Sequence, residues 1–224
     1  MSVIRQPNVL GRTTQRRLVG VTAALSSATA ETAAVGAWFV LVVVEARTLE
    51  TAMAGLGILF CGALLRTGAF GVATSNLVDL LQPRRLLAAM VLTASWIVWL
   101  LIAERVGGQT GVAVAALSLA LVLTGQFALE RRVFHVTARS NDERRLGWIV
   151  SRIAGFVPGL IVAVGATALL ATAWFADWSL RSVPFTLGET TVVFELPALY
   201  LGVLAFWLCS FLAQQRRLNR TLGS

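Results

Sequence analysis

Six long apolar runs, separated by short polar connectors, constrain this chain more than any other feature. A helix rises about 1.5 Å per residue, so about 17 to 25 apolar residues cross a hydrocarbon layer of about 30 Å. The chain is 57% hydrophobic with a mean hydropathy of +0.76, which is more apolar side chain than one soluble core of this size encloses. We therefore predict an all-α integral membrane protein with spans at residues 18–44, 51–81, 86–103, 110–129, 146–175 and 196–213.

Arginine is distributed unevenly between the connectors. All 19 basic residues are arginine, and 14 of them lie in the two tails and in the second and fourth connectors, against three in the remaining connectors. Cytoplasmic segments next to membrane spans are enriched in arginine. This pattern predicts a multi-pass protein of the cell membrane, with residues 1–17 and 214–224 as cytoplasmic tails and residues 18–213 as a single six-helix transmembrane domain.

The connector between the fifth and sixth runs has a different composition. β-Branched and aromatic residues stand on both sides of Gly188 and Glu189. Such runs around two turn residues are typical of a β-hairpin. The expected fold is therefore a six-transmembrane-helix bundle with a small extracytoplasmic β-hairpin between helices five and six.

Several functions are disfavoured by composition. Without lysine there is no Schiff-base chemistry and no P-loop clamp. One histidine, His135, and two cysteines, Cys61 and Cys209, are too few for a Cys/His zinc site or a two-histidine haem within one chain. No hydrolase or protease motif is present. We expect no enzymatic activity, no cofactor, no metal and no nucleic-acid partner, and we interpret both cysteines as packing residues.

Two opposite charges lie inside apolar runs. Glu31 is in the first run and Arg66 is in the second, each near the middle of its run. An arginine exposed to lipid costs at least about 2.5 to 3.5 kcal/mol on insertion scales. Because consecutive helices joined by a short connector normally pack together, we predict a mid-membrane Glu31–Arg66 ion pair.

This pair has two interpretations. With the hydroxyls of Ser27 and Thr32, and of the neighbouring Ser26 and Thr29, it could line a polar pathway in a small-solute or ion transporter or in a membrane subunit of one. Alternatively, it is a static bridge in a non-catalytic scaffold or accessory subunit of a larger membrane complex.

The expected partners follow from the same features. They are the lipid bilayer, further copies of the chain or other membrane subunits, and anionic lipid head groups at the cytoplasmic arginine loops, above all residues 130–145.

Packing and interface residues can also be predicted. Glycines in the second run, and Gly155 and Gly159 in the fifth, permit close approach of helices. Trp96 and Trp99, towards the end of the third run, are expected at the membrane interface.

Overall fold

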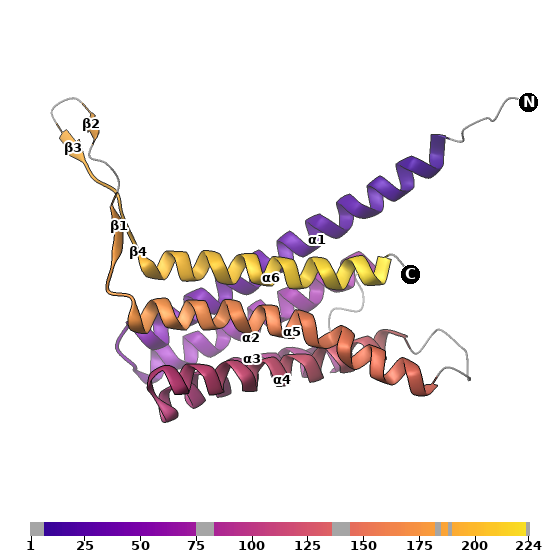
Figure 1. The fold of residues 1–224 in the computed structure, drawn as a ribbon, viewed down its shortest axis with the longest axis horizontal. Coiled ribbons are helices and arrows are strands. Elements are labelled where there is room, and N and C mark those ends of the chain that lie inside the picture. Colours follow the sequence, from indigo (N-terminus) through magenta and orange to yellow (C-terminus); the bar gives the residue numbers. More distant parts are fainter. Residues whose placement is uncertain (1–6, 75–82, 136–143, 182–184, 188–189, 223–224) are drawn as a thin grey trace, which may run out of the picture. The chain divides into compact units, whose positions relative to one another are not determined.

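The computed structural model describes residues 7–74, 83–135, 144–181, 185–187 and 190–222 (Figure 1). Within these residues, six helices are long and apolar enough to cross a membrane. The elements are α1 (Pro7–Phe39), the π-helix η1 (Val40–Val44), α2 (Leu49–Thr74), α3 (Pro83–Val106), α4 (Gly108–His135), α5 (Arg144–Phe175), β1 (Ser179–Arg181), β2 (Phe185–Leu187), β3 (Thr190–Val192), β4 (Glu195–Pro197) and α6 (Ala198–Leu222).

The chain divides into two compact units. The first contains residues 1–93 and 211–224, and the second contains residues 94–210. Helices α3 and α6 each contribute one part to either unit. Judged by helix length and composition, the six predicted membrane-spanning helices are confirmed.

In the first unit, a capped connector joins α1 to α2. The hydroxyl of Thr48 accepts a hydrogen bond from the Thr51 amide at 3.1 Å, and the Thr51 hydroxyl accepts one from the Thr48 amide at 2.9 Å. This reciprocal cap satisfies two amide groups at the start of α2. It fixes where α2 begins, and the short connector turns it back along α1.

Glycines of α2 let this helix approach α1 closely. A Cβ at Gly62 would overlap the methyl group of Ala34, and one at Gly55 would lie 2.9 Å from Cδ1 of Trp38. Gly62 follows Gly55 on α2, whereas its contact Ala34 precedes Trp38 on α1, so the two helices are antiparallel. The small residues form the seam that places Glu31 and Arg66 opposite each other.

In the second unit, aromatic side chains form much of the core. Trp96 and Trp99 are each 1% exposed, and the Trp96 ring meets the ring of Phe206 at 5.4 Å in an edge-to-face arrangement. Both rings are therefore buried inside the protein instead of lying against lipid head groups, because their side of α3 faces α6. Their expected depth at the membrane interface stays a prediction.

Glycines also bring α5 against its neighbours in the second unit. A Cβ at Gly159 would lie 2.8 Å from the Thr124 hydroxyl on α4, and one at Gly165 would lie 2.7 Å from Cβ of Cys209 on α6. Close packing is confirmed at Gly159, whereas the packing around Gly155 lies outside the described part of the chain. Cys209 is a packing residue as expected, but Cys61 is exposed, which contradicts the same expectation for it.

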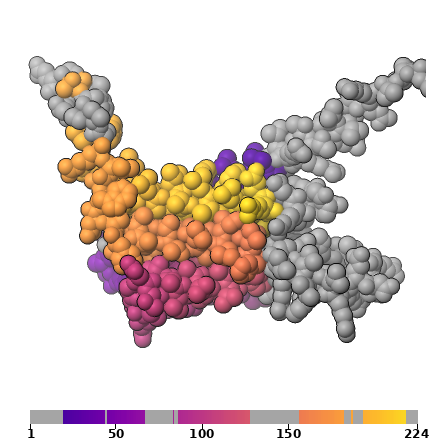
Figure 2. Space-filling model, in the orientation of Figure 1, coloured from indigo at the N-terminus to yellow at the C-terminus, as the bar shows by residue number. Residues whose placement is uncertain are grey.

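The predicted hairpin is present between α5 and α6. Strands β2 and β3 pair antiparallel, with Leu187 opposite Thr190 and two residues between them. A second antiparallel pair, β1 with β4, extends the hairpin towards the helices, with Leu180 opposite Leu196. This second pair was not predicted from the sequence. We call β1 and β4 the ribbon; in the space-filling view it adjoins the ends of α5 and α6 (Figure 2).

Helix ends differ from the predicted spans. Helix α1 already begins at Pro7, α4 continues to His135 and α6 to Leu222. Part of each predicted tail and of the 130–145 loop is therefore helical, because arginine, glutamine and leucine are good helix formers and extend a helix into polar surroundings. The remainder of that loop, residues 136–143, lies outside the described residues.

Candidate functional site

Glu31 of α1 and Arg66 of α2 form a buried ion pair in the first unit. Nη1 of Arg66 donates a hydrogen bond of 2.6 Å to Oε1 of Glu31. The two residues are 3% and 2% exposed, respectively. The predicted pair therefore forms, and its short distance is typical of a charge-assisted hydrogen bond.

The two residues lie at the same height. Gly62 of α2 meets Ala34 of α1, and the helices are antiparallel. A step of one turn along α2 to Arg66 therefore matches a step of one turn back along α1 to Glu31. The ion pair joins residues that face each other across the seam.

Gln214 of α6 supplies a third group. Its Nε2 donates to Oε2 of Glu31 at 3.5 Å, and its Oε1 accepts from Nη1 of Arg217 at 3.2 Å. A carboxylate only accepts hydrogen bonds and a guanidinium only donates them. The side-chain amide of Gln214 therefore points its nitrogen towards Glu31 and its oxygen towards Arg217. The result is a polar chain from Arg66 through Glu31 and Gln214 to Arg217.

Sequence analysis had assigned residue 214 to a cytoplasmic tail, whereas the structure buries Gln214 completely, at 0% exposure. A signal for this burial exists in the spacing, since Phe206, Ser210 and Gln214 follow one another at intervals of four and are all buried. A polar residue that continues a buried helical stripe is a candidate partner for a buried charge.

Ser27 and Thr32 lie on either side of Glu31 along α1, and both are buried. Within the described part of the chain, neither hydroxyl has a hydrogen-bond partner. Several other hydroxyls on the apolar helices bond back to their own helix, as Thr93 does to the carbonyl of Ala89 at 2.9 Å, although the buried hydroxyl of Ser210 on α6 also has no partner among the described residues. Ser27 and Thr32 are therefore available to a polar group that reaches them.

The other two predicted hydroxyls are placed differently. Ser26 and Thr29 lie on the exposed side of α1. Helical geometry explains the division, because neighbouring residues point about 100° apart and only one side of α1 meets α2. The polar cluster, as we call it, therefore consists of Ser27, Glu31, Thr32, Arg66 and Gln214.

The groups of the polar cluster can bind polar ligands and pair charges. It contains one carboxylate and one guanidinium, whose charges cancel, together with an amide and two hydroxyls. Over the described ranges, no three histidine, cysteine, aspartate or glutamate residues gather in a group that could hold a metal ion.

Comparison of the chain with protein-family models, with curated proteins and with solved structures finds no match.

Proposed function

We propose that this integral membrane protein is a small-solute or ion transporter, or a membrane subunit of one, in which the polar cluster lies on the transport pathway. The observation that carries the proposal is the pair of buried hydroxyls of Ser27 and Thr32 beside Glu31, neither of which has a partner among the residues that the structure describes. Buried polar groups in proteins are nearly always hydrogen-bonded, and exceptions often mark a place where a water, an ion or a ligand binds.

The contacts of Glu31 support the same proposal. Its Oε1 is held tightly by Arg66 at 2.6 Å, whereas among the described residues Oε2 has a single contact, with Nε2 of Gln214 at 3.5 Å. Hydrogen bonds of that length are weak. A carboxylate oxygen accepts up to two hydrogen bonds, so Oε2 retains capacity for a passing cation or donor.

The topology completes the proposal. The protein crosses the cell membrane six times with both termini in the cytoplasm, and its arginine-rich cytoplasmic segments contact anionic lipid head groups. Because one chain of this size encloses little space, transport takes place in a homo-oligomer or together with other membrane subunits. The polar cluster binds the solute without catalysing a reaction.

The test removes the hydroxyls and leaves the ion pair intact. Ser27→Ala and Thr32→Val eliminate groups that stabilise nothing visible in the described structure, so the variants should fold as well as the parent. Proteoliposomes containing proton-, sodium- or chloride-sensitive dyes report flux. We expect flux in the parent and a clear loss in both variants.

Ser118→Ala on α4 is the matched control. The Ser118 hydroxyl already donates to the carbonyl of Ala115 at 2.8 Å, so its removal should leave flux unchanged. Equal flux in the Ser27→Ala variant and in this control would contradict a pathway through the polar cluster.

The alternative function is a non-catalytic scaffold or accessory subunit, in which the ion pair only fixes how helices dock. The contact that favours it is the bridge from Glu31 to both α2 and α6. In that case the Ser27 and Thr32 variants behave like the parent in every assay. Glu31→Gln alone would then disrupt assembly, and combining it with Arg66→Met would restore much of it.

A further inference from the structure

The ribbon between α5 and α6 has two chemically different faces. Leu180 and Leu196 stand directly opposite each other, so they project from one face. Arg181 and Glu195 form the next opposite pair and project from the other face, where Nε of Arg181 contacts Oε1 of Glu195 at 2.5 Å. Side chains alternate along a strand, which makes the ribbon amphipathic.

Aromatic residues extend the apolar face. Trp178 precedes Leu180 by two residues and Phe194 precedes Leu196 by two, so the period of an extended chain places both on the leucine face. All four of these side chains are about half exposed. An exposed apolar surface of this kind is a site of interaction with a protein or a membrane.

The position of the ribbon identifies the partner. Its strands connect the ends of two membrane-spanning helices, and the amide of Ala198 at the start of α6 donates to the carbonyl of Trp178 at 3.2 Å. In Figure 1 the ribbon runs across the axes of α5 and α6 rather than along them. A strand pair in that direction at the end of spanning helices lies along the membrane surface.

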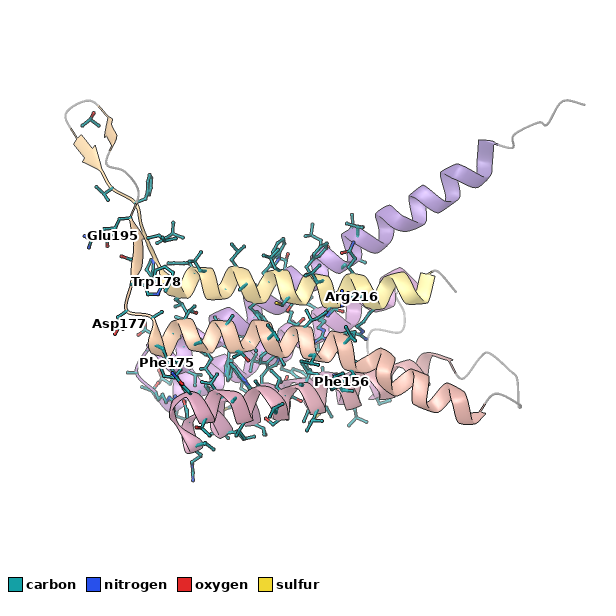
Figure 3. All side chains as sticks on the ribbon, viewed as in Figure 1. Phe156, Phe175, Asp177, Trp178, Glu195 and Arg216 are labelled. Carbon is teal, nitrogen blue, oxygen red and sulfur yellow. The ribbon has the colours of Figure 1, made fainter. Side chains whose placement is uncertain are left out.

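The apolar face is also continuous with the lipid-facing surface of the helices. Phe175 at the end of α5 and Tyr200 in the first turn of α6 are both exposed, and Figure 3 shows Phe175, Asp177, Trp178 and Glu195 following one another from α5 onto the ribbon. Tryptophan and tyrosine favour the layer where hydrocarbon meets head groups.

We propose that the leucine face of the ribbon rests on the lipid surface as an interfacial anchor, with Trp178 and Phe194 among the head groups and the Arg181–Glu195 pair in water. This arrangement resembles an interfacial amphipathic helix in its energetics, because burial of the apolar face provides the affinity. The anchor holds the ends of α5 and α6 at the membrane surface, and it does not depend on the proposed transport function.

The test places a nitroxide spin label at single cysteines in a chain carrying Cys61→Ala and Cys209→Ala. Leu180→Cys and Leu196→Cys report the leucine face, and Arg181→Cys and Glu195→Cys are matched controls on the other face. In phosphatidylcholine vesicles, the collision rates of each label with oxygen and with a water-soluble nickel chelate are measured.

We expect labels on the leucine face to collide preferentially with oxygen, which dissolves in lipid, and the control labels to collide preferentially with nickel. Equal nickel accessibility on both faces would overturn the proposal, because the ribbon would then stand in water. Protection of the leucine face from both reagents would also overturn it, since a protein or a second copy would cover that face. Circular dichroism and size-exclusion profiles identical to those of the parent establish that each variant is folded.

Discussion

Substitution of Gly62 is the most direct test of how the ion pair is built, because a Cβ added there would overlap the methyl group of Ala34. Two methyl carbons rest about 3.5 to 4.0 Å apart, so Gly62→Ala forces α1 and α2 apart by roughly 1 Å or more. Arg66 lies one turn further along α2. The same movement would lengthen its 2.6 Å contact with Glu31 to about 3.6 Å, beyond hydrogen-bond range.

The expected cost combines these two effects. Overpacking a close contact costs about 1 to 3 kcal/mol, and a lost hydrogen bond to a charged group costs about 1.5 to 3 kcal/mol. Alanine recovers up to about 1 kcal/mol through its higher helix propensity. We expect Gly62→Ala to lower the free energy of unfolding by about 1.5 to 6 kcal/mol, measured by reversible unfolding in mixed micelles.

Gly57 provides the matched control on the same helix, since a Cβ there meets nothing within 4 Å. Gly57→Ala should be neutral or should stabilise the protein by up to about 1 kcal/mol through helix propensity. If both substitutions changed stability equally, α1 and α2 would not be in contact through Gly62. The Gly62–Ala34 contact would then not be what positions Arg66 against Glu31.

Three further predictions test the packing and the charges. Glu31→Gln and Arg66→Met should each destabilise the protein by about 3 to 5 kcal/mol, and the double variant by clearly less than their sum, in the same unfolding assay; additive costs would show that the charges do not interact. Gly159→Ala should cost about 1 to 3 kcal/mol and Gly125→Ala, in open space, almost nothing; thermal unfolding distinguishes them. Gln214→Leu should cost about 1 to 3 kcal/mol by leaving charged neighbours less well solvated, whereas unchanged stability would exclude Gln214 from the polar cluster.

Much of the architecture was predictable from local patterns. The transfer of a side chain from water to hydrocarbon is nearly additive along a helix, so apolar length alone indicates six spans. The hairpin follows from β-branched residues around Gly188 and Glu189. Even the Glu31–Arg66 pair was predictable, because two isolated opposite charges in consecutive spans have few other ways to avoid lipid.

Tertiary packing decided what the sequence left open. Whether Ser27 or Ser26 joins the polar cluster depends on the rotation of α1 about its axis, which the Ala34–Gly62 contact sets. That Gln214 reaches Glu31 depends on where the last turns of α6 lie, because its spacing from Phe206 and Ser210 indicates a buried side of the helix but not the group that it meets there. The spacing of residues in the sequence indicates which side of a helix is apolar. The packing of α1 against α2 and α6 determines which polar groups on that side meet.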